Sequence, residues 1–108
     1  MKYVIDIDGT LCSKNEINYS MAVPFTDRIK KINELYDQGN HITIFTARGM
    51  NTYNGNIKEI YLHYYDFTID QLKKWEVKYH ILIMGKPSGD FYIDDKGINA
   101  DEFFTNLQ

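Results

Sequence analysis

Short β-branched and aromatic runs alternate along the chain with stretches whose apolar side chains recur at helical spacing. Each run is bounded by Gly, Pro, Asn or Asp, as is typical of strands buried in a sheet. The pattern therefore predicts four strands, at Lys2–Asp8, His41–Phe45, Tyr79–Met84 and Phe91–Asp94.

Helical spacing is clearest between Pro24 and Gly39, where five apolar side chains share one face. Proline suits the first turn of a helix and glycine suits the position just past its end. Three further helices are predicted: over Ile57–Tyr65, from an N-cap at Thr68 to about Glu76, and from a cap at Asp101 through Phe104. The polar stretch Ser13–Ser20 is expected to be a loop or a small hairpin, and Met50–Asn56 is expected to be an exposed loop.

Strands that alternate with helices need crossover connections, and these produce a mostly parallel sheet with helices on both faces. The expected fold class is therefore α/β, a Rossmann-like three-layer sandwich around a central sheet of about four strands. The length of 108 residues suits one domain, and nothing resembles a linker or a repeat, so residues 1–108 are expected to form a single domain.

A chemically reactive side chain follows each predicted strand. In parallel sheets, ligands bind at the carboxyl ends of the strands, so these side chains are expected to meet at one edge. They are Asp6 and Asp8, then Thr46, then Lys86, and finally Asp94 and Asp95.

Asp6 and Asp8 are two positions apart, so an extended backbone directs both side chains to the same face. With Asp94 and Asp95 nearby, mutual repulsion raises carboxyl pKa values or demands a counter-ion. Mg2+ with oxygen ligands resolves the conflict and also binds phosphate. Lys86 adds a positive charge, so the predicted pocket suits a phosphoryl group.

The ordered set Asp6-Ile7-Asp8-Gly9-Thr10, Thr46, Lys86 and Asp94-Asp95 resembles the four motifs of the haloacid dehalogenase (HAD) superfamily. The resemblance implies a phosphatase in which Asp6 is the nucleophile and Asp8 the general acid and base. Thr46 would bond a phosphoryl oxygen, and Lys86 would neutralise charge.

The resemblance also implies that Mg2+ binds Asp6, the Asp8 backbone carbonyl and a carboxylate of the last motif. Asp95 is favoured for that place over Asp94, with the reverse order left open. Arg48 is a candidate to hold a substrate anion, and a surface ion pair explains it equally well.

The phrases Thr46–Gly49 and Met84–Lys96 are similar to those of small phosphatases of bacterial capsular-polysaccharide gene sets. This implies a phosphorylated sugar or capsule precursor as substrate. The gaps between motifs leave no room for a folded cap domain, so loops or another subunit of a homo-oligomer are expected to cover the site.

Composition removes several other classes of function. A formal charge of -3 and a single cysteine, Cys12, argue against a nucleic-acid-binding face, an internal disulfide and a cysteine metal cluster. Cys12 is expected to serve packing. No apolar run is long enough to span a bilayer, so no membrane partner and a cytoplasmic location are expected.

Two other functions remain open at this point. A receiver-like phospho-acceptor domain also forms an aspartyl phosphate with an acidic cluster, a threonine and a lysine, although no carboxylate pair follows its lysine. A catalytically silent relative would bind a sugar phosphate or a partner protein.

Overall fold

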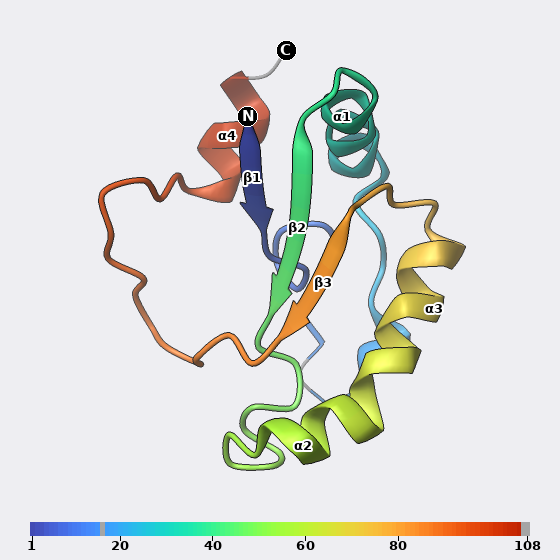
Figure 1. Ribbon diagram of the computed structural model, residues 1–108, viewed down its shortest axis with the longest axis vertical. Helices are drawn as coiled ribbons and strands as arrows, with labels where there is room; N and C mark the ends of the chain where they lie inside the picture. The colour runs from blue at the N-terminus through green and yellow to red at the C-terminus, as the bar shows by residue number, and fades with distance from the viewer. Residues whose placement is uncertain (16, 107–108) are drawn as a thin grey trace.

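The computed structural model describes residues 1–15 and 17–106. Three parallel strands, β1 (Lys2–Ile5), β2 (His41–Thr46) and β3 (Ile81–Met84), form a sheet in the order β1-β2-β3 (Figure 1). Strands alternate with helices, which confirms the α/β class and the parallel arrangement for three of the four predicted strands.

The helix predicted between Pro24 and Gly39 is α1 (Thr26–Asp37), and it follows the short 3-10 turn η1 (Tyr19–Met21). Its buried side chains, Ile29 and Ile32, belong to the predicted apolar face. Gly39 follows the helix with a φ of +92°, a left-handed conformation that glycine adopts without strain. The end of this helix is therefore where the sequence places it.

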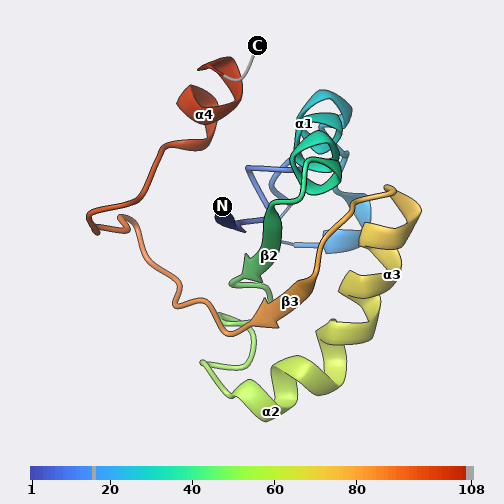
Figure 2. The same cartoon turned by 45° about the horizontal axis from the view of Figure 1, so that its top comes forward.

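A second, longer helical arm connects β2 to β3 (Figure 2). It consists of α2 (Ile57–Ile60), the π-helical turn η2 (Tyr61–Tyr65) and α3 (Asp66–Lys74), which follow one another without a break. The N-cap predicted at Thr68 is wrong, because Thr68 lies fully buried inside α3. The arm begins instead at Asn56, whose side chain accepts from the backbone N–H of Glu59 at 3.2 Å.

Only one face of the sheet is well covered. On that face Ile42, Ile44 and Leu82 are buried beneath the helices, as alternate residues of neighbouring strands. On the other face Val4 is 67% exposed and Ile81 is 46% exposed. The predicted three-layer sandwich is thus not formed by the part of the chain that the structure describes, in which the helices and the sheet bury one common core.

The two outer edges of the sheet also differ. At β3, the backbone N–H of Met84 donates to the hydroxyl of Tyr61 at 3.1 Å, so a side chain of the helical arm bonds to that edge at its carboxyl end. At β1, no strand among residues 1–15 and 17–106 pairs with the outer edge. An unpaired edge leaves backbone donors and acceptors available for another strand.

The predicted fourth strand is not formed. Residues 85–99, here called the outer segment, contain no strand and leave the sheet in a wide loop, with Phe91 84% and Ile93 94% exposed (Figure 1). The physical reason is length, because a parallel strand needs a crossover of about a dozen residues and only residues 85–90 separate β3 from Phe91.

The chain then returns to the start of β1 as α4 (Ala100–Asn106), where the rings of Phe103 and Tyr3 lie 5.9 Å apart. Asn99 caps this helix, since its side chain accepts from the backbone N–H of Asp101, and the cap predicted at Asp101 is one position inside the helix. None of the helices described here is long and apolar enough to cross a membrane.

Candidate active site

Asp6 and Asp8 lie where β1 runs into a tight turn at the carboxyl end of the sheet. Gly9 makes this turn with a φ of +83°, and its N–H donates to the carbonyl of Cys12 at 2.8 Å. A side chain at this position would be strained whatever space it had. The Asp-x-Asp-Gly motif is therefore a strand followed by a reversal that returns the chain towards the sheet.

Asp6 has two polar neighbours and a partly open carboxylate. Its Oδ1 lies 3.6 Å from Nζ of Lys86, and its Oδ2 accepts from the Thr10 hydroxyl at 3.4 Å. The side chain is 30% exposed. Burial raises the pKa of Asp6 above its ordinary value, and the positive charge of Lys86 partly offsets that effect.

Asp8 is held much more firmly by Arg48. Nε of Arg48 donates to Oδ2 of Asp8 at 2.9 Å, and Nη2 donates to Oδ1 at 3.0 Å. The Arg48 side chain is completely buried, so the prediction of a surface ion pair is wrong. A two-pronged, charge-assisted contact of this kind fixes both side chains.

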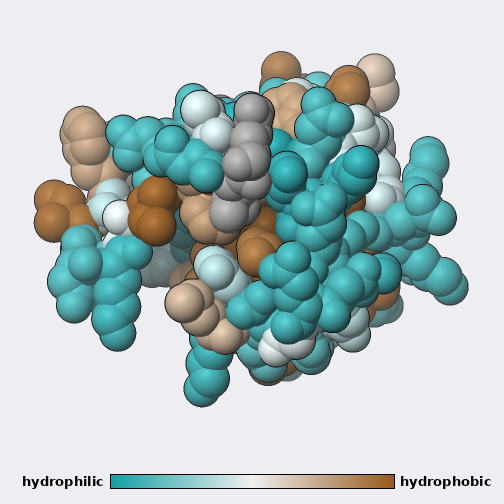
Figure 3. All heavy atoms as spheres, turned by 90° about the horizontal axis from the view of Figure 1, so that it is seen from above, coloured by the Kyte–Doolittle hydropathy of each residue, from teal (hydrophilic) through white to brown (hydrophobic). Residues whose placement is uncertain are grey.

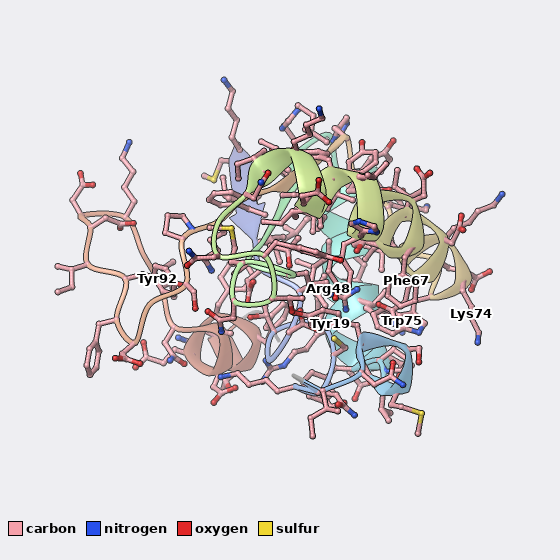
Figure 4. All side chains as sticks on the ribbon, turned by 90° about the horizontal axis from the view of Figure 1, so that it is seen from below. Tyr19, Arg48, Phe67, Lys74, Trp75 and Tyr92 are labelled. Carbon is pink, nitrogen blue, oxygen red and sulfur yellow. The ribbon has the colours of Figure 1, made fainter. Side chains whose placement is uncertain are left out.

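Arg48 is enclosed on all sides by groups from separate elements. Its guanidinium carbon lies 4.8 Å from the ring centre of Tyr19 and 5.9 Å from that of Phe67, and Nη1 donates to the Thr68 hydroxyl at 3.5 Å (Figure 4). Aromatic faces attract a cation that has lost its water. Arg48 thus joins the loop before α1 and the arm α2–α3 to the end of β1.

Thr46 ends β2 and Lys86 follows the neighbouring strand β3, so their backbones lie side by side. The backbone N–H of Lys86 donates to the carbonyl of Thr46 at 3.1 Å. The Thr46 hydroxyl is fully buried and accepts from the backbone N–H of Arg48 at 3.1 Å. Lys86 reaches Asp6 with its amine, which also lies 4.3 Å from the ring centre of Tyr92.

Asp94 and Asp95 do not join this group. Both are exposed on the outer segment, and Oδ1 of Asp94 accepts from the backbone N–H groups of Lys96 and Gly97 in a local turn. The prediction that they meet Asp6 at one edge is therefore wrong within a single chain. The cause is the missing fourth strand.

The residues of one chain do not fit a complete Mg2+ site. Lys86 and Arg48 balance the charges of Asp6 and Asp8, so the negative excess that called for a cation is absent. Among the residues that the structure describes, no three His, Cys, Asp or Glu side chains gather in a metal-binding group. Asp6 is the one partly open carboxylate at this site, whereas the sequence predicts a metal site with carboxylates from Asp6 and the last motif.

Several members of the site have no clear sequence signal. Tyr19 and Phe67 enclose Arg48, yet lone aromatic residues do not show by pattern which charge they contact. The sequence points to Thr10 only as part of the Asp-Gly-Thr turn. Cys12 is confirmed as a packing residue: it is fully buried, and burial together with the charge of Asp8 raises the pKa of its thiol to about 12.

The fold and the site define a small α/β protein with paired aspartates at the carboxyl end of its first parallel strand. A crystal structure of an MCSG target from Vibrio cholerae is similar, with a TM-score of 0.90 and 36% identity over 96% of this chain and 87% of that chain. The chain therefore belongs to the same family as the Vibrio protein.

A chain in the structure of the Pnkp1/Rnl/Hen1 complex is more distantly similar, with a TM-score of 0.57 and 23% identity over 86% of this chain. The match spans only 30% of that longer chain, and at this identity it shows the fold alone. No family model matches the sequence. No curated protein matches it either.

Proposed function

We propose that the protein is a HAD-type phosphomonoester hydrolase in which Asp6 attacks phosphorus. The observation that carries this proposal is the position of Asp6 at the carboxyl end of β1, partly open and 3.6 Å from the Lys86 amine. Ligands of parallel α/β sheets bind at this end. A carboxylate beside a lysine suits attack on an anionic group whose charge the lysine offsets.

In the first proposed step an oxygen of Asp6 bonds to phosphorus and the bond from phosphorus to the ester oxygen breaks. The leaving alcohol takes up a proton, and an aspartyl phosphate remains. In the second step water attacks this intermediate, releases inorganic phosphate and regenerates the carboxylate of Asp6. Two displacements in sequence replace one difficult step.

Asp8 is the proposed source of the proton for the leaving alcohol and the base for the attacking water. Both of its oxygens accept from Arg48, so this role requires Arg48 to release one of them during turnover. The proposed fourth strand, Phe91–Asp94, is not formed within one chain and would have to be added to the sheet by another molecule. The proposed substrate is a phosphorylated sugar or capsule precursor, and Mg2+ is the proposed cofactor.

The test is phosphate release from p-nitrophenyl phosphate with and without Mg2+, for the unmodified protein and for Asp6→Asn. We expect metal-dependent turnover that falls by at least about a thousandfold in the variant, because the nucleophile is lost. Asp37→Asn is the matched control, since Asp37 also pairs with a lysine, Lys78, but on the surface. Equal turnover in Asp6→Asn and in the control would exclude this mechanism.

One observation favours a second candidate, a phospho-acceptor domain of the receiver type. With Asp8 bound to Arg48 through both oxygens, hydrolysis of an aspartyl phosphate lacks a free base. Acetyl phosphate with a radioactive phosphoryl group distinguishes the two functions. Stoichiometric labelling that persists without phosphate release would support the acceptor, whereas continuous release supports the hydrolase.

A further inference from the structure

The unpaired edge of β1 and the exposed outer segment together indicate that the sheet is incomplete. The outer segment carries exposed apolar side chains on both sides of its chain, including Phe91, Tyr92 and Ile93, of which Ile93 is 94% exposed. Apolar surface also stands out on the flank of the molecule where this segment lies (Figure 3). Such a run of strand-forming residues next to an open edge indicates a strand that lacks its partner.

The segment is too short for an ordinary crossover to the edge of its own β1 in the parallel direction. Such a crossover takes about a dozen residues, and only residues 85–90 separate β3 from Phe91. Phe91 would have to lie three strand spacings, about 14 Å, across the sheet and about 12 Å back along it, and the chain would also have to pass over one face. A parallel fourth strand from another molecule needs no such crossover.

The direction of the outer segment makes such an exchange symmetrical. It leaves the carboxyl end of the sheet, where Lys86 bonds to Thr46, and ends beside the start of β1, where Phe103 contacts Tyr3. It thus runs opposite to β1, outside the open edge (Figure 1). A two-fold axis there places the segment of a second copy antiparallel to the first, hence parallel to β1 of the first copy.

Most of the outer segment also lies within the part of the chain that matches a crystal structure. The match to the Vibrio cholerae structure covers 96% of this chain with a TM-score of 0.90. The residues left unmatched are fewer than those of the outer segment, so most of the segment belongs to the matched part.

We propose that two copies of this chain exchange their outer segments, each adding Phe91–Asp94 as a strand beside β1 of the other. The partner's Asp94 and the partner's Asp95 then reach the carboxyl end of β1, next to Asp6. Their carboxylates would add to Asp6 the negative charge that one chain lacks for a Mg2+ site. Only the catalytic consequence of this inference rests on the proposed function. The strand exchange itself is argued from the unpaired edge of β1 and from the short connection between β3 and Phe91.

Mixing two inactive variants tests whether the site is shared. Asp6→Asn and the double variant Asp94→Asn, Asp95→Asn are refolded separately and together, and hydrolysis of p-nitrophenyl phosphate is measured. Random pairing in an equal mixture gives one intact site in half of the dimers, hence about a quarter of unmodified activity. Absence of recovery, with an active unmodified protein, would overturn the exchange and leave the hydrolase proposal standing.

A second measurement does not depend on activity. Sedimentation equilibrium is expected to give a dimer for the unmodified protein and a smaller species for Ile93→Asp, because a charge on the added strand opposes its burial. Ile17→Asp is the matched control, since Ile17 is 99% exposed and lies outside the segment. A monomeric unmodified protein, or equal effects of both variants, would overturn the proposal even if no substrate is found.

Discussion

Asp6 and Asp8 leave the same strand two positions apart, yet they occupy different environments. Asp6 has one lysine at 3.6 Å and one weak hydroxyl contact at 3.4 Å, and its side chain is 30% exposed. Asp8 accepts two bonds from Arg48, at 2.9 and 3.0 Å. One carboxylate is available to a ligand, and the other holds together three parts of the fold.

The difference shows that the two aspartates of one sequence motif have different roles: Asp6 is available for chemistry, and Asp8 stabilises the fold. A lysine on a flexible stem holds a carboxylate loosely, whereas a planar guanidinium with two parallel donors fixes it. The burial of Arg48 between Tyr19 and Phe67 strengthens the second arrangement. The comparison predicts that changes at the Asp8 contact affect folding most and that changes at Asp6 affect it least.

Arg48→Met is expected to have the largest effect on folding. It leaves the partly buried Asp8 without its cation, and breaking a buried ion pair from one side costs about 3–5 kcal/mol. Urea denaturation measures the loss in the free energy of unfolding. Lys78→Met is the control: its pair with Asp37 is equally short, at 2.8 Å, but about half exposed, so about 0–1 kcal/mol is expected. Similar losses in both variants would remove the distinction between the two pairs.

Replacing each aspartate by asparagine compares the two positions directly. Asp8→Asn weakens both contacts with the buried Arg48 and is expected to lower the free energy of unfolding by about 1–3 kcal/mol. Asp6→Asn is expected to leave it unchanged or slightly higher near neutral pH, because burial disfavours the charge that the variant removes. Chemical denaturation of the two variants in parallel checks this order, and a larger loss in Asp6→Asn would contradict it.

The smallest expected effect is on the pH dependence of stability. Because the pKa of Asp6 is raised in the folded state, its contribution is fully present below the ordinary value of 3.8 and is lost as pH rises through the raised pKa. Asp6→Asn cannot titrate, so its stability relative to the unmodified protein should increase over that window. Denaturation at several pH values between about 3.5 and 6.5 tests the sign; a decrease would mean that Lys86 outweighs burial.

Much of the fold follows from local patterns. The β-branched runs gave β1, β2 and β3, and the apolar face between Pro24 and Gly39 gave α1, because periodicity and turn residues act over a few positions. The backbone contact of Thr46 with Lys86 followed from the topology of a parallel sheet. These features need no knowledge of distant contacts.

The errors arose where distance along the chain mattered. Phe91–Asp94 has the composition of a strand, but six preceding residues cannot carry it across its own sheet. Asp94 and Asp95 were therefore placed beside Asp6 without a path to that position. The burial of Arg48 was also missed, since its partners Tyr19, Phe67 and Thr68 come from separate regions whose proximity only the fold creates.

The hydroxyl of Tyr61 on the backbone of Met84 limits how far any assembly of these sheets can grow. A molecule with two unpaired sheet edges can add another molecule at each edge without limit, as in fibres. Here the edge at β3 is already bonded at Met84 by a side chain from the helical arm. Reciprocal pairing at the other edge consumes the remaining one in both molecules, so the resulting assembly is finite, and a fibre would first have to displace this tyrosine.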